Sequence, residues 1–158
     1  MLRYRRTCPM AWVTVLAGAV AACEIPHGVW REAPLTQLPP ADCVRGVLLS
    51  TPGIVAVRDT MREGDYHFDY WGKNREVAGM LDLRRYKRNG QVRFGFEQSL
   101  WVMNRNPPQD VVDRTRPVMR SVESNLERRC GLDGLTSSID ERCSAGVRCP
   151  DLPSALTY

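Results

Sequence analysis

The sequence predicts an α+β fold: a two-layer sandwich with about four mostly antiparallel strands and two main helices on one face. Apolar residues recur at helical spacing in two segments, near residues 42–50 and 111–130. Between these segments, several runs alternate between apolar and polar residues, as half-exposed strands do. The pair Asn89-Gly90 lies between two such runs and is typical of a two-residue hairpin turn.

The first helix and the first strand follow a pair of prolines. Asp42 is placed to cap the start of this helix. The apolar face of the helix would consist of Val44, Val47 and Leu48. The turn Thr51-Pro52-Gly53 ends the helix, and the β-branched run Ile54–Val57 then predicts a short strand.

Alternation with a period of two begins at Asp65. It predicts one strand over residues 65–71 with an aromatic side, and a second strand over residues 77–86. The second strand leads into the hairpin turn Asn89-Gly90. A long strand follows over residues 92–103, in which Gly95 permits a bulge or close packing.

The second helix begins after Asn106-Pro107-Pro108, and its apolar positions recur at intervals of three to four residues up to Cys130. Gly131 is suited to cap its end. Pro117 interrupts the pattern, and a proline inside a helix costs about 3 kcal/mol. The sequence therefore predicts either a kink or a helix that starts near Arg116.

Helices that cover one face of a sheet leave the opposite face available for binding. By alternation that face carries the charged residues Asp82, Arg84, Arg93 and Glu97. Trp71 and Trp101 belong to the same alternation class. Large indoles among charges are typical of a binding surface. The candidate partner-binding residues are therefore Trp71, Trp101, Arg84, Arg93 and Glu97. In the alternative interpretation, a bulge or register change turns one or both tryptophans inward.

The N-terminus has the order of an export signal. Arg3, Arg5 and Arg6 precede the apolar run Trp12–Val20, which is too short to span a bilayer. Residues 1–22 are therefore predicted to be a signal peptide. An ordinary secretory signal cut after Ala22 and an uncut anchor are the alternatives.

The run Val20-Ala21-Ala22-Cys23 resembles the lipobox of bacterial lipoproteins, in which the cysteine thiol is acylated and the chain is then cut so that this cysteine comes first. The resemblance covers only the first two dozen residues. It implies that Cys23 carries the lipid and that the membrane is a partner through this lipid. It also implies a location in the bacterial cell envelope facing the periplasm, with the outer membrane favoured over the inner.

After the signal peptide, we expect a lipidated N-terminal tether over residues 23–40, a single α+β domain over residues 41–149 and a loose tail over residues 150–158. The chain of 158 residues has a formal net charge of +4. Removing residues 1–22, which hold three arginines and no acid, leaves 19 basic and 18 acidic residues. Because this charge is nearly balanced, the composition gives no case for a nucleic-acid partner.

Four cysteines follow Cys23, and an even number in an exported protein predicts disulfides. Three pairings are possible. We expect Cys43 to pair with Cys130, which lies at the end of the second helix, if the two helices run side by side in parallel with a stagger, or cross. Cys143 and Cys149 would then close a small loop. The spacings lack the close pairs of zinc sites and the C-x-x-C of redox sites.

Few residues suggest catalysis. His67 shares one side of a strand with Asp65 and Asp69, so it could act as a general base or as part of a metal site, but a surface histidine is the favoured interpretation. His27 lies in the predicted tether. We therefore expect no catalytic residue, no metal and no cofactor.

The run Arg84–Arg88 is the densest cationic cluster and lies near the hairpin turn. It could bind acidic lipid head groups or an acidic protein surface. A solvated hairpin end, whose charges prevent sheet edges from aggregating, is the favoured interpretation.

These observations predict a lipid-anchored periplasmic binding protein that acts through contact with a protein partner in the envelope. An immunity or inhibitor lipoprotein directed against a secreted effector is one form of this function, by analogy of size and location alone. The alternatives are a structural component of an envelope or secretion assembly, and a small envelope enzyme or ligand carrier.

Overall fold

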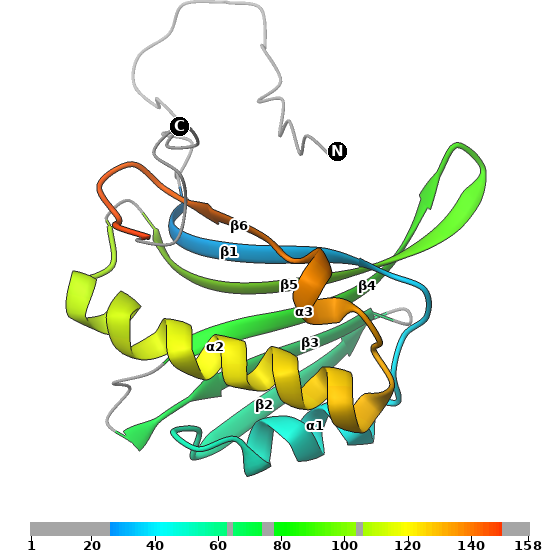
Figure 1. Cartoon of the computed structure of the whole chain (residues 1–158), viewed down its shortest axis with the longest axis horizontal. Helices are drawn as coiled ribbons and strands as arrows, with labels where there is room; N and C mark the ends of the chain where they lie inside the picture. Colours follow the sequence, from blue (N-terminus) through cyan, green and yellow to red (C-terminus); the bar gives the residue numbers. More distant parts are fainter. Residues whose placement is uncertain (1–25, 63–64, 74–77, 104–105, 150–158) are drawn as a thin grey trace, which may run out of the picture.

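The computed structural model describes residues 26–62, 65–73, 78–103 and 106–149 (Figure 1). Its elements are β1 (Pro26–Leu35), α1 (Ala41–Ser50), β2 (Ala56–Arg62), β3 (Asp65–Trp71), β4 (Ala78–Arg88), β5 (Gln91–Met103), α2 (Gln109–Cys130), α3 (Leu135–Ser138) and β6 (Asp140–Cys143). The strands form one antiparallel sheet in the order β2-β3-β4-β5-β1-β6. Figure 1 shows the helices on one face of this sheet. The predicted α+β two-layer fold is confirmed, with six strands in place of about four.

The segment expected to be a tether instead contains a strand inside the sheet. β1 pairs with β5 from Pro26 to Leu35 and with β6 from Val29 to Glu32. The prediction of a tether over residues 23–40 is therefore wrong, and the folded domain includes Pro26, three residues after Cys23. Pro26 and Pro34 lie outside the four residues that pair with β6, and proline is tolerated where a strand has an unpaired side.

The first helix starts two residues earlier than a cap at Asp42 predicts. Pro40 occupies the N-cap position, so Asp42 is not the cap and lies in the first turn, where an acidic residue suits the helix dipole. The predicted apolar face is confirmed by the burial of Val44, Val47 and Leu48. The strand expected over residues 54–57 begins at Ala56 and extends to Arg62, because Ile54 packs into the core before the sheet begins.

The β4–β5 hairpin has the predicted turn. Asn89 and Gly90 have φ values of 51° and 75°, as a type I′ turn requires. Pairing runs without a bulge from Arg88 opposite Gln91 to Met80 opposite Ser99. Gly95 serves close packing, because a Cβ atom at this position would lie 3.2 Å from Cε1 of Tyr86.

The second helix is one continuous element. α2 begins at Gln109, so a start near Arg116 is ruled out, and helical structure continues through the exposed Pro117. Gly131 caps it with φ 69°, as predicted. Figure 1 shows α1 and α2 side by side and antiparallel, whereas a parallel staggered pair or a crossing pair was expected. This direction brings the start of α1 beside the end of α2.

Both expected disulfides are present. Cys43 joins Cys130 with a Cα–Cα distance of 5.9 Å, and Cys143 joins Cys149 at 6.5 Å. The first bridge spans 87 positions and the second six. In the chain-entropy view, the longer loop contributes about 4–5 kcal/mol and the shorter about 2–3 kcal/mol.

The core lies between the sheet and the helices in two clusters. The larger cluster is centred on the aromatic residues Phe68, Tyr70 and Phe96 beneath α1 and the second half of α2. The smaller cluster lies beneath the first half of α2 and includes Val29, Leu100, Val112, Met119, Cys143 and Val147.

Between the sheet and α2 lies a buried ion network. Arg31 of β1 binds Glu123 of α2 through two hydrogen bonds, Nε to Oε1 at 2.6 Å and Nη2 to Oε2 at 3.0 Å. Glu141 of β6 forms ion pairs with both Arg31 and Arg116. The side chains of these four residues are at most 10% exposed. These buried charges therefore join β1, α2 and β6.

Gln98 and Tyr70 extend this network toward the larger cluster. The Gln98 amide takes the orientation that satisfies both of its ends: its nitrogen donates to Glu123 Oε1 at 2.9 Å and to the Met119 carbonyl at 3.2 Å, and its oxygen accepts from the Tyr70 hydroxyl at 2.7 Å. Burial raises the pKa of Tyr70, and this favours the protonated hydroxyl that donates this bond. Burial also raises the pKa of Glu123, against the hydrogen bonds and charge of Arg31.

Replacing Arg31 by methionine should strongly destabilise the fold, because it leaves the buried Glu123 carboxylate without its main partner. We expect Arg31→Met to lose about 3–5 kcal/mol of unfolding free energy, measured by urea denaturation at neutral pH. The double variant Arg31→Met/Glu123→Met should recover part of this loss. Arg45→Met is the control, because Arg45 and Asp59 form an exposed pair that solvent screens, so its loss should change stability far less. Equal losses for Arg31→Met and Arg45→Met would contradict the importance of the network.

Candidate protein-binding face

The sheet face opposite the helices, here called the open face, carries three rows of residues across the strands. Directly paired residues of neighbouring strands point to the same side. The first row is His67, Asp82, Glu97, Glu32 and Asp140. The second row is Arg58, Asp69, Met80, Ser99, Trp30 and Arg142. The third row contains Ala56, Trp71 and Ala78.

His67 lies between two carboxylates on the open face. Its Nδ1 is 2.6 Å from Asp82 Oδ1, and its Nε2 is 3.1 Å from Asp69 Oδ1. Asp65, which the sequence grouped with His67, instead accepts a hydrogen bond from the backbone N–H of Arg85 at 2.7 Å. Both ring nitrogens of His67 are thus engaged by the protein itself. His67 is therefore part of a hydrogen-bonded cluster with Asp69 and Asp82 on the open face.

Arginines continue the network at both ends. Arg58 donates to Asp69 Oδ2 from Nε at 3.0 Å and also from Nη2. Arg84 donates to Asp82 Oδ2 at 2.7 Å and lies 3.6 Å from Glu97 Oε2. The side chains of Asp69 and Asp82 are only 20% and 13% exposed. A partner would therefore meet charges whose positions are already fixed.

A shallow concavity of about 300 Å³ lies beside this network. It is lined by Arg58, Asp69, Tyr70, Trp71, Ala78, Gly79, Met80, Ser99 and Leu100. Trp71 and Met80 are half-buried, so each keeps apolar surface in contact with solvent. Ser99 lies between Met80 and Trp30 in the register and is only 1% exposed. The lining of the concavity therefore combines apolar side chains with the charged Arg58 and Asp69.

The structure separates the sequence-predicted candidates. It places Trp71 in the concavity and Arg84 and Glu97 in the adjoining network. Arg93 lies farther along the hairpin, opposite Tyr86, and donates to Gln91 Oε1 at 2.6 Å. The side chain of Trp101 lies outside the described part of the structure. For Trp71, the alternative of an inward orientation is excluded.

Trp30 is a member of the open face that the sequence analysis did not select. It stands opposite Ser99 of β5 and Arg142 of β6 and is half-buried. The signal that could have found it is the alternation of Val29, Arg31 and Ala33 against Trp30 and Glu32. The inward arginine conceals that alternation.

Glu97 is held between two other carboxylates in the first row, Asp82 and Glu32. Burial is the main reason that the pKa of Glu97 is raised; the charge of Arg84 opposes this, and the two neighbouring carboxylates add to it. The ionised form of Glu97 is therefore disfavoured in the folded protein relative to the unfolded chain.

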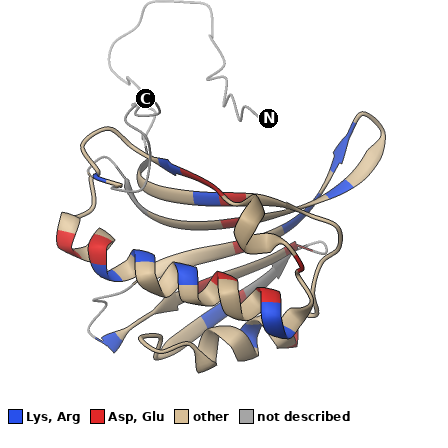
Figure 2. Cartoon of the chain, viewed as in Figure 1, with Lys and Arg blue, Asp and Glu red and all other residues tan. Residues whose placement is uncertain are grey.

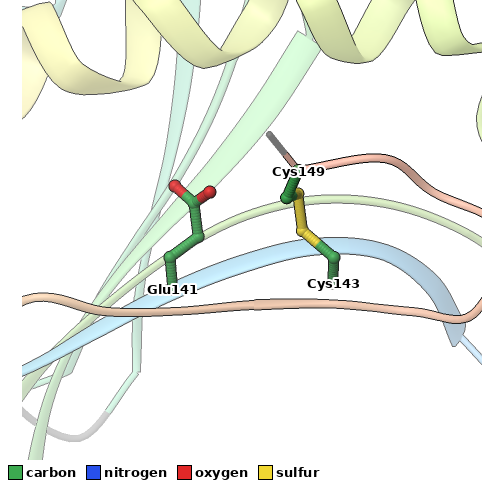
Figure 3. Close-up of side chains that lie close together, drawn as sticks. All are labelled: Glu141, Cys143 and Cys149. Carbon is green, nitrogen blue, oxygen red and sulfur yellow. A yellow bond between two sulfur atoms is a disulfide. The ribbon is translucent and has the colours of Figure 1, made fainter. Parts of the chain in front are cut away.

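A second cluster, Glu141, Cys143 and Cys149, brings three potential ligand atoms within 4.8 Å (Figure 3). Figure 3 shows the two sulfurs joined to each other, so neither is a free thiolate. The Glu141 carboxylate is already paired with Arg116 and Arg31. This cluster is therefore part of the structural framework and not a metal centre.

Substituting Glu97 should make stability less dependent on pH. The pKa of Glu97 is raised in the folded state, so above that pKa the ionised carboxylate destabilises the fold. This loss of stability disappears as the pH falls below the pKa of a glutamate in the unfolded chain, about 4.3. Glu97→Gln should therefore unfold at a higher temperature than the parent at pH 7.5, with the difference vanishing near pH 4. Asp110→Asn removes an exposed acid as the control. A Glu97→Gln chain that is less stable at every pH would show that the Arg84 pair outweighs burial.

The chain matches no protein-family model and no curated protein sequence. None of the helices in the described ranges combines the length and the apolar character needed to span a membrane.

Proposed function

We propose that this protein is a lipid-anchored binding protein of the bacterial cell envelope that contacts a protein partner through its open face. Two features support the location. The sequence up to Cys23 resembles a lipobox, and two disulfides suit an oxidising compartment such as the periplasm.

The observation that carries the binding role is the half-buried Trp71 and Met80 in a concavity bordered by ordered ion pairs. Protein interfaces concentrate their binding energy in aromatic anchors near the centre, surrounded by polar residues. Fixed charges also lower the entropy lost on association, because Asp69 and Asp82 need no reordering.

A protein partner fits this face better than a small ligand. A concavity of about 300 Å³ is at the lower limit of ligand pockets, and this one lies on a sheet surface and not between elements. One or two partner side chains would fill it. An immunity or inhibitor lipoprotein against a secreted effector is our preferred form of the function, and a component of an envelope assembly is the second candidate.

The anchor is tested by metabolic labelling with an alkyne palmitate analogue. The parent chain should incorporate label and fractionate with membranes, because the Cys23 thiol is the acceptor. Cys23→Ser should lose both properties. Ser144→Ala serves as a control substitution outside the lipobox. Equal labelling of the parent and Cys23→Ser would contradict lipidation.

The binding face is tested by photo-crosslinking in cells. A photoreactive amino acid in place of Trp71 or Met80 should give the same covalent protein adduct from either position. The matched control is Leu49 on α1, which is 50% exposed and lies on the helical side of the molecule. Adducts from Leu49 but not from Trp71 or Met80 would contradict the proposal.

A further inference from the structure

The end of the β4–β5 hairpin, here called the arm (Arg85–Arg93), extends beyond the rest of the sheet. β3 pairs with β4 only as far as Leu83, and β1 pairs with β5 only from Phe94 onward. Beyond these points the two strands of the arm pair only with each other. Figure 1 shows the arm projecting from the sheet as a curved ribbon.

The arm concentrates unpaired positive charge. It holds Arg85, Lys87, Arg88 and Arg93 and no acidic residue, and Figure 2 shows its basic segments without an acidic one. The side chains of Arg85, Lys87 and Arg88 are exposed and form no ion pair with any described residue. Seven arginines elsewhere in the described structure pair with carboxylates, namely Arg31, Arg45, Arg58, Arg84, Arg114, Arg116 and Arg142. Arg128 and Arg148 are exposed outside the arm like its own cations, so they serve in the control below.

Contacts at its base hold the arm in one shape. Asp65 of β3 accepts a hydrogen bond from the Arg85 backbone at 2.7 Å, and the Tyr86 ring lies over Gly95. The type I′ turn closes the tip. An isolated two-stranded ribbon is marginally stable in water, so these contacts matter. The arm therefore presents its cations in a defined arrangement, with Val92 40% exposed among them.

The strand register shows at which end of β1 the arm lies. Pro26 is opposite Met103, and Leu35 is opposite Phe94, so the arm lies at the end of β1 that is remote from Pro26. Ten strand residues span about 30 Å. If Cys23 carries the lipid, as the proposed function holds, the three residues from Cys23 to Pro26 reach about 10 Å at most. The base of the arm then lies about 30 Å along β1 from the anchored end of the strand, several times the Debye length of about 8 Å.

We propose that the arm is an electrostatic docking element for an acidic surface of a protein partner. This inference rests on the proposed function for the choice of a protein over the lipid head groups of the anchoring membrane. Docking differs from a role in preventing aggregation. Charges of either sign would prevent aggregation, whereas docking to an acidic surface requires positive charge.

The test compares two triple charge reversals in the full chain, purified in nonionic detergent. Arg85→Glu/Lys87→Glu/Arg88→Glu reverses the arm. The matched control, Arg114→Glu/Arg128→Glu/Arg148→Glu, makes the same change in net charge on α2 and the C-terminal loop. The probe is immobilised poly-L-glutamate at low ionic strength. The arm reversal should weaken binding about tenfold or more while the protein stays monodisperse, and the control should change it far less. Equal effects of the two reversals, or an arm reversal that binds like the parent, would overturn the proposal.

A second measurement on the same protein tests whether the arm binds the membrane instead of a protein. The parent is inserted through its own anchor into vesicles with increasing phosphatidylglycerol, and tryptic cleavage at Arg85, Lys87 and Arg88 is followed. The rate should not depend on the anionic lipid. Protection that grows with phosphatidylglycerol would assign the arm to lipid and overturn the choice of a protein. Cys23→Ser should bind poly-L-glutamate like the parent, so a failed anchor remains distinguishable from a failed arm.

Discussion

The structure depends on the pairing of Arg31 with Glu123 and Glu141 in the space between sheet and helix. An arginine pointing into a core is unfavourable unless carboxylates meet it there with good geometry. Glu123 supplies two hydrogen bonds from α2, and Glu141 supplies its charge from β6. These contacts allow β1 to occupy the centre of the sheet's second half. Glu141 then joins the edge strand β6 to β1, and Glu123 joins α2 to it.

The same constraint shapes the open face. Because Arg31 points toward α2, its neighbours Trp30 and Glu32 point the other way and complete two of the cross-strand rows. Glu32 pairs with Arg142 of β6. A charge buried on one side of β1 thus determines which aromatic and acidic groups are offered on the other.

Local chemistry explains what could be predicted from the sequence. Asn89-Gly90 has a turn preference that needs no tertiary information, and the apolar faces of α1 and α2 follow from spacing alone. The pairing of Cys43 with Cys130 was predicted, although the helix direction was not, since spacing does not specify how helices align. Trp71 was placed on the open face by alternation.

What could not be predicted depends on contacts between distant parts of the chain. Arg31 breaks the apolar alternation of β1, and the four prolines of this region favour an extended linker over a strand, so the central role of β1 is visible only with Glu123 in place. His67 was grouped with Asp65 and Asp69. Asp69 is indeed a partner, but the other partner, Asp82, comes from the neighbouring strand. That choice is set by the β3–β4 register and not by sequence proximity.

The position of β1 also has a kinetic consequence. Val29 lies opposite Leu100 and Cys143, so the strand nearest the N-terminus finds its neighbours only after most of the chain exists. Contacts of such high contact order slow folding, because a long loop must close before they form. The β2–β5 meander is built from short-range pairings and can form first. Until β1 docks, the flank of β5 is an unpaired strand edge, and such an edge can pair with another chain.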